Sequence, residues 1–128
     1  MKRILVIDDQ AHVRAAIASI LRANGMEAVS VEDGASGLHT FDGSAFDLVI
    51  VDVYMPKIDG VKIIKQLRAR SPHLPIIAIS GVMLRESTRM ALDMLPNVPE
   101  LNDVVCLKKP FRASELLAAI EQAAGVSA

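Results

Sequence analysis

Five side chains able to carry a charge or donate a proton stand at the ends of short apolar runs, or directly after them: Asp8, Asp9, Asp52, Ser80 and Lys109. The most informative is Asp52, in the stretch DLVIVDVYMPKIDG, because it follows a run of apolar residues typical of a core. Burying a carboxylate is costly unless a cation or a metal ion compensates its charge. The pattern therefore predicts a polar site to which distant parts of the chain contribute.

The chemistry of such a site follows from its residue types. Oxygen ligands with no histidine or cysteine among them suit Mg²⁺ or Mn²⁺ rather than zinc. A carboxylate can also be the nucleophile in phosphoryl transfer and form an aspartyl phosphate, a reaction that depends mainly on positioning and charge stabilisation. The ammonium of Lys109 and the hydroxyl of Ser80 could then each contact a phosphoryl oxygen. As an alternative, Asp8 and Asp9 only cap the first helix.

The elements that must position these side chains can be predicted from hydrophobic periodicity. The short apolar runs predict five strands, at 3–7, 27–31, 47–51, 75–80 and 104–107. Helices are predicted at 10–24, 35–41, 61–68, 84–95 and 114–124, the last with Ser114 as its N-cap. This alternation favours right-handed βαβ units and a doubly wound parallel α/β sheet. Such sheets bind ligands beyond the carboxyl ends of their strands, where the five polar side chains are expected.

Composition limits the class of protein. A chain of 128 residues, 52% of them hydrophobic, has the size of one ordinary domain with a proper core. Its net charge of −1 gives no general attraction to nucleic acid or to an anionic membrane, so we expect no direct nucleic acid binding. The apolar runs are too short for a transmembrane helix or a signal peptide, so membrane insertion is not expected. The single cysteine, Cys106, cannot form an internal disulfide, and the cytoplasm is the expected location.

Four motifs, in order along the chain, carry a resemblance to a known family: VIDDQ, DVYMPKIDG, ISG and KKPF. Together they resemble the receiver domain of bacterial response regulators, the CheY-like family. The resemblance covers residues 1–125 as a single domain and leaves 126–128 as a short tail. It implies a flavodoxin-like (βα)5 fold with strand order 2-1-3-4-5.

The resemblance also implies a metal site for Mg²⁺, with Mn²⁺ as a substitute. Asp9 would bind the metal directly, and Asp8 would assist, partly through water. Asp52 and the backbone carbonyl of Tyr54 would supply the remaining protein ligands. Each of these positions matches the family's motif in this sequence.

The phosphoryl chemistry implied by the resemblance centres on Asp52 as the phosphoacceptor. Ser80 would be the switch hydroxyl that moves toward the phosphoryl group. Lys109 would pair with the phosphoryl oxygens, and its peptide bond to Pro110 would be cis, which costs little at proline. These assignments imply a domain that assists its own phosphorylation and dephosphorylation and is not otherwise an enzyme.

The function implied is a switch controlled by phosphorylation. A sensor histidine kinase or a histidine phosphotransfer protein would supply the phosphoryl group. A downstream protein would bind the face made by the fourth helix, fifth strand and fifth helix, and the chain would be a monomer or weak dimer. We expect a single-domain regulator; the alternatives are a receiver from a longer regulator and an interaction module independent of phosphorylation. A haloacid-dehalogenase-like phosphatase is disfavoured, because Tyr54 occupies the place of that family's second aspartate.

Two features depart from the family pattern. Cys106 stands where an aromatic residue is usual, and we expect an inert buried thiol there, with a redox role as the alternative. The segment 96–103 is part of an insertion, rich in proline and turn-forming residues, before the fifth strand. Both features lie on the expected output face, so we expect the signal to leave this domain by an altered route.

Overall fold

A computed structural model describes residues 2–53, 60–81 and 101–125. The predicted helix at 84–95, Tyr54 and most of the insertion at 96–103 lie outside these residues. The strands are β1 (Arg3–Ile7), β2 (Glu27–Val31), β3 (Leu48–Asp52), β4 (Ile76–Ser80) and β5 (Val105–Lys108). The helices are α1 (Ala11–Ala23), α2 (Gly34–Asp42), α3 (Gly60–Arg70) and α5 (Ala113–Ala123).

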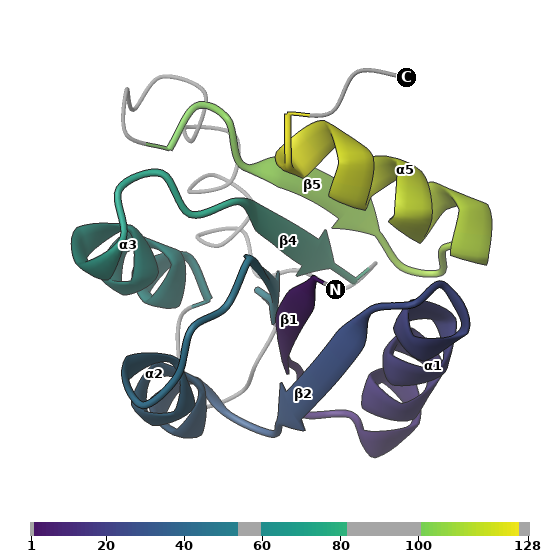
Figure 1. Cartoon of the computed structure of the whole chain (residues 1–128), viewed down its shortest axis with the longest axis horizontal. Helices are drawn as coiled ribbons and strands as arrows, with labels where there is room; N and C mark the ends of the chain where they lie inside the picture. The colour runs from purple at the N-terminus through teal and green to yellow at the C-terminus, as the bar shows by residue number, and fades with distance from the viewer. Residues whose placement is uncertain (1, 54–59, 82–100, 126–128) are drawn as a thin grey trace.

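The five strands form one parallel sheet in the order β2-β1-β3-β4-β5. Figure 1 shows α1 and α5 on one side of this sheet and α2 and α3 on the other. The predicted α/β class, the parallel pairing and the strand order are therefore confirmed. Because all strands run the same way, every carboxyl end lies at one edge of the sheet, and the loops there meet.

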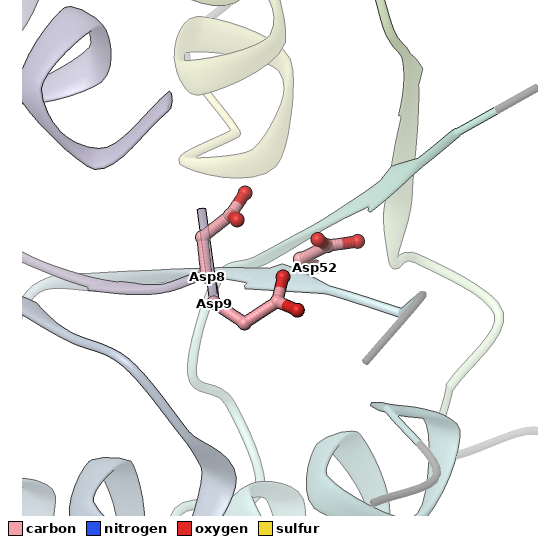
Figure 2. Close-up of side chains that lie close together, drawn as sticks. All are labelled: Asp8, Asp9 and Asp52. Atoms are coloured by element: carbon pink, nitrogen blue, oxygen red, sulfur yellow. The ribbon is translucent and has the colours of Figure 1, made fainter. Parts of the chain in front are cut away.

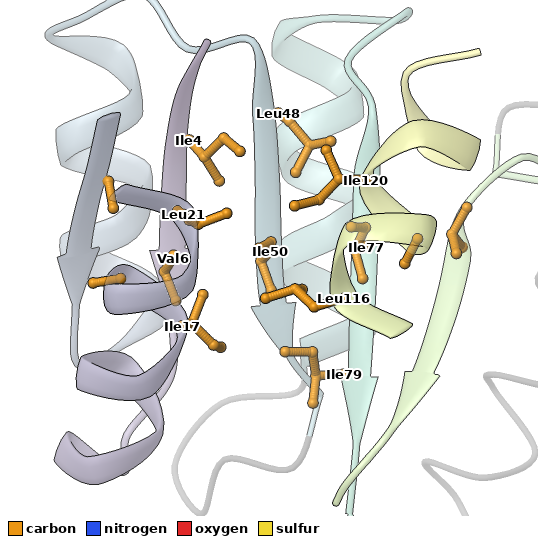
Figure 3. Packing of buried hydrophobic residues seen from close by; sticks show 14 residues of the cluster. Ile4, Val6, Ile17, Leu21, Leu48, Ile50, Ile77, Ile79, Leu116 and Ile120 are labelled. Carbon is orange, nitrogen blue, oxygen red and sulfur yellow. The ribbon is translucent and has the colours of Figure 1, made fainter. Parts of the chain in front are cut away.

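The burial of the strands explains why they read as continuous apolar runs. β3 and β4 are buried along their whole length, as expected for central strands with helices on both faces. Successive side chains point to opposite faces, so Val6 and Ile50 join a core beneath α1 and α5 (Figure 3). Leu5 and Val51 join a second core, which includes buried residues of α3. The two cores hold the sheet rigid beneath the edge that carries the polar side chains.

Arg68 of α3 is a charged residue that the core accepts. It is only 6% exposed. Its Nε donates to the carbonyl of Leu74 at 2.7 Å, and its Nη1 lies 2.9 Å from Oδ1 of Asp103. A buried guanidinium is tolerated only when it is paired and hydrogen-bonded. Arg68 therefore ties the segment before β5 to α3.

Several predicted boundaries and environments require correction. β3 begins and ends one residue later than expected, so Asp52 is its last residue rather than the residue after it. Ser114 is not the N-cap of α5, because the helix begins at Ala113 and the cap residue is Arg112. The backbone N–H of Arg112 instead donates to Oε1 of Glu115 at 2.8 Å.

Cys106 was predicted to be buried, and this is wrong: it is exposed. The neighbouring Val105 joins the core beneath α5, so Cys106 points to the opposite face of the sheet. Because β5 is an edge strand, the side chain of Cys106 remains accessible on that face.

Candidate functional site

Three carboxylates meet at the carboxyl edge of the sheet: those of Asp8, Asp9 and Asp52. Asp8 and Asp9 directly follow β1, and Asp52 ends the adjacent β3 (Figure 2). One ligand oxygen of each residue lies within 4.8 Å of the others. Asp8 and Asp52 are each 1% exposed, whereas Asp9 is exposed at the surface. The structure thus brings together the three acidic residues predicted as metal ligands.

The position of Asp52 depends on its own strand and on the start of α3. Asp52 is paired in register with Ile79 of β4, and the next residue, Val53, donates its N–H to the Ile79 carbonyl at 2.9 Å. Gly60 begins α3 against this backbone: a Cβ at residue 60 would lie 2.3 Å from Cα of Val53. Only glycine allows such a close approach without displacing the chain that carries Asp52.

Asp8 is held by hydrogen bonds on several sides. Its Oδ1 accepts from the backbone N–H of Gln10 at 2.8 Å, and its carbonyl accepts from Nη1 of Arg14 at 2.7 Å. Its own N–H donates to the carbonyl of Val31 at 3.2 Å. Its Oδ2 is buried, and within the described residues no hydrogen bond reaches it. A buried carboxylate oxygen without a hydrogen bond is costly, and the ion pair that it forms with Nζ of Lys109 at 3.0 Å offsets part of this cost.

Lys109 is the cation that the fold brings to these acids. Its Nζ lies 3.1 Å from Oδ2 of Asp52 and 3.0 Å from Oδ2 of Asp8. It also donates to Oε1 of Gln10 at 2.9 Å. The predicted cis peptide bond between Lys109 and Pro110 is confirmed. Lys109 therefore meets residues placed by two other strands, although it is far from them in sequence.

The balance of charge at this edge favours a further cation. Among the described residues, the cluster has three carboxylates and one ammonium. The excess of negative charge and the all-oxygen donor set suit a hard divalent ion. These three residues could hold such an ion. The fourth expected ligand, the carbonyl of Tyr54, lies outside the described residues.

Ser80 ends β4 at the same edge and is 7% exposed. Its carbonyl accepts the N–H of Lys109 at 2.8 Å, which links the carboxyl end of β4 to the Lys109 backbone. The structure thus places Ser80 beside the strand that carries Asp52. Its predicted role as a switch hydroxyl stays a prediction.

A cleft of about 540 Å³ opens beside the cluster. Its polar end is lined by Asp52, Lys109 and Gly81. Residues of α1 and of the loop before α5 line the rest, and the apolar ones include Val13, Ile20 and Phe111. Gln10 lines it too, and our prediction from the sequence missed this residue. The available signal was a long amide directly after the acid pair, at the start of the first helix, where a short capping side chain is usual.

Comparison with known proteins agrees with this geometry. The sequence profile described as "Response regulator receiver domain" matches residues 4–121. The chain is 35% identical over 120 residues to the sensory transduction protein RegX3 of Mycolicibacterium smegmatis, covering 94% of this chain and 49% of the relative. It is 31% identical over 119 residues to the transcriptional regulatory protein PrrA of Mycobacterium bovis, covering 93% of this chain and 48% of the relative. The chain thus spans about half the length of the curated relatives it matches.

Solved structures are similar along nearly the whole chain. A response regulator receiver domain protein from Clostridium thermocellum superposes with a TM-score of 0.81 at 28% identity, covering 98% of this chain and 95% of that one. The response regulator TrrA of Thermotoga maritima, solved in complex with Mg²⁺ and BeF, gives a TM-score of 0.78 at 28% identity, covering 96% and 99%. The profile match, the relatives and the shared fold lead to one conclusion: the chain belongs to the response regulator receiver domain family.

Proposed function

We propose that this domain is a phosphoacceptor in a two-component phosphorelay, and that Asp52 receives the phosphoryl group. The observation that carries the proposal is the position of Asp52. Its carboxylate is buried at the end of β3, yet it lines a cleft and lies 3.1 Å from the ammonium of Lys109. A nucleophilic carboxylate needs both access for a phosphodonor and a cation beside the transferred group.

The reaction follows from these residues. One carboxylate oxygen of Asp52 attacks phosphorus, and the bond from phosphorus to the donor's histidine nitrogen breaks with its electron pair on the nitrogen. Lys109 stays beside Asp52 and interacts with the negative phosphoryl oxygens. Asp8, Asp9, Asp52 and the carbonyl of Tyr54 would hold Mg²⁺, which, when bound, supplies further neutralisation of charge on those oxygens.

The partners belong to the same proposal. Receiver domains interact with sensor kinases and with effector domains. We assign the phosphodonor to a sensor histidine kinase or a histidine phosphotransfer protein. The phosphoryl group would draw in the hydroxyl of Ser80, which ends the buried β4 beside β5. A downstream protein would then bind the face that includes β5 and α5. The domain would be a monomer or weak dimer, and it would not bind nucleic acid directly.

The size of the relatives bears on how the domain is used. The matched curated relatives are about twice as long as the matched segment. This supports the alternative, a receiver that belongs to a longer regulator, over the predicted single-domain regulator. In that arrangement residues 1–125 would be the receiver unit, and an effector domain would read its state.

The proposal is tested by intact mass spectrometry after incubation with acetyl phosphate and Mg²⁺. We expect one labile phosphate adduct on the wild-type chain and none on Asp52→Asn. Asp42→Asn, which changes an aspartate of α2 that pairs with Arg70, is the matched control and should be labelled like wild type. An unlabelled wild type, or a labelled Asp52→Asn, would contradict the proposal and favour an interaction module independent of phosphorylation.

A further inference from the structure

Gln10, at the start of α1, contacts Lys109, and both residues line the cleft. Its Oε1 accepts from Nζ of Lys109 at 2.9 Å, although 99 positions separate the two residues. An ammonium donates hydrogen bonds and never accepts them, so the amide must present its oxygen to Lys109. Nζ of Lys109 thus donates hydrogen bonds to Gln10 and Asp52, and it forms an ion pair with Asp8.

The backbone of Gln10 is fixed, so its side chain extends from a rigid base. Gln10 is the N-cap residue of α1, yet within the described residues its side chain makes no capping hydrogen bond. Its N–H donates to Oδ1 of Asp8 at 2.8 Å, and its carbonyl accepts from the N–H groups of Val13 and Arg14 at 3.1 and 3.0 Å. Ser, Thr, Asp or Asn would use its side chain on the helix here, whereas the longer amide reaches Lys109.

This geometry matters because lysine is a poor positioning group when left alone. Its ammonium is a compact charge on a flexible stem, and ordering the stem costs rotamer entropy. We infer that Gln10 is a positioning residue for phosphoryl transfer: its amide oxygen holds the ammonium of Lys109 beside Asp52. The inference rests on the proposed phosphorylation of Asp52.

The transfer step shows where such positioning has its effect. With acetyl phosphate as donor, an Asp52 oxygen forms a bond to phosphorus. The bond from phosphorus to the acetate oxygen breaks, and acetate leaves with the electron pair. The phosphoryl oxygens carry negative charge throughout, and a cation already in place stabilises it without reorganising. Without Gln10, the ammonium leaves this position for part of the time and the step slows.

The rate test uses Gln10→Met, which keeps the length and unbranched shape of the side chain but removes the acceptor. At fixed Mg²⁺ and acetyl phosphate, we expect phosphorylation about three- to tenfold slower than wild type, the range for losing one hydrogen bond. The control is Gln122→Met, the same substitution at an exposed residue of α5, which should leave the rate unchanged. A wild-type rate in Gln10→Met would overturn the inference while leaving the proposed function intact.

A second measurement observes the ammonium directly and needs no phosphorylation. In ¹⁵N-labelled protein, we expect a protected Lys109 ammonium resonance in wild type, its loss in Gln10→Met, and its retention in Gln10→Glu, which keeps an oxygen at the same reach. A purely structural role for Gln10 would not move this signal. A resonance absent from wild type, or equally protected in Gln10→Met, would overturn the inference. A wild-type chain that acetyl phosphate does not label would instead contradict the proposed function.

Discussion

The two ends of the sheet both gather charged residues, but they treat charge differently. At the amino edge, Arg3 of β1 lies 3.4 Å from Glu27, donates its backbone N–H to Asp47 at 2.7 Å, and places its guanidinium 4.8 Å from the ring centre of Phe46. Its side chain is 33% exposed and that of Glu27 is 52% exposed. At the carboxyl edge, Asp8 and Asp52 are buried with Lys109 as their shared cation.

This difference in burial separates the amino-edge charges, which only stabilise the fold, from the carboxyl-edge charges, which the proposed phosphoryl transfer uses. The charges of the amino-edge cluster are paired and reach solvent, so each contact contributes little to the free energy of folding and none has a large desolvation cost. The carboxyl-edge cluster keeps negative charge in excess and partly out of water, which destabilises the fold unless a cation is present. A metal ion bound by the three carboxylates would relieve this excess of negative charge.

The largest effect is expected from removing the shared cation. Lys109→Met leaves two buried carboxylates side by side, and we expect the free energy of unfolding to fall by about 3 kcal/mol in EDTA at neutral pH. Chemical denaturation of wild type and variant measures this loss. Lys62→Met, which alters an exposed lysine of α3, should stay within about 0.5 kcal/mol of wild type. Equal stability of both variants would mean that the carboxyl edge tolerates its charge as easily as the amino edge.

The next effect is that of the metal. A divalent ion bound only by the folded domain stabilises it by about 2.7 kcal/mol at a hundred times its dissociation constant. We therefore expect Mg²⁺ to raise the melting temperature of wild type, and Asp9→Asn to lose most of this increase. Thermal unfolding with and without Mg²⁺ measures both. Asp47→Asn, at the amino edge, is the control and should keep the full response; a full response in Asp9→Asn would remove Asp9 from the site.

A smaller effect is expected from crowding the backbone next to Asp52. In Gly60→Ala the new Cβ would meet Cα of Val53, and we expect about 2 kcal/mol of destabilisation and a weaker Mg²⁺ response. Denaturation together with a Mg²⁺ titration tests this. Gly43→Ala is a suitable comparison, because a Cβ there would meet its nearest heavy atom at an ordinary 3.7 Å. If the two alanine variants behave alike, the start of α3 does not position Asp52.

The smallest effect is expected at the amino edge itself. Arg3→Met removes a partly exposed ion pair, a contact with Phe46 and hydrogen bonds to Ser44 and Ala45, and we expect a loss of about 1 kcal/mol. Its rate of phosphorylation by acetyl phosphate should equal that of wild type. A clear fall in that rate, measured by intact mass, would show that the two edges are coupled.

Much of the site could be predicted because two simple rules apply to this chain. Apolar runs identify the strands, and parallel strands bring their carboxyl ends to one edge, so the sequence alone groups Asp8, Asp52 and Lys109. The exposure of Cys106 was not predicted, although the expected strand order places the fifth strand at the edge, because an apolar run does not show which of its side chains face the open side of the sheet. The N-cap of α5 was also predicted wrongly. Ser114 has a typical capping side chain, but the helix begins at Ala113, and the backbone N–H of Arg112 donates to the side chain of Glu115.

The sequence by itself determined the class of fold, the strand order through its family resemblance, and the residue types at the carboxyl edge. The tertiary structure alone decided how those residues share their charges. Lys109 lies between Asp8 and Asp52 while Gln10 holds it from the cleft side, and Oδ2 of Asp8 stays buried without a hydrogen bond among the described residues. The physical reason is that periodicity is a local property of the chain. The partners of one ammonium are instead set by side-chain directions, within a few ångströms, on strands that meet only in the folded sheet.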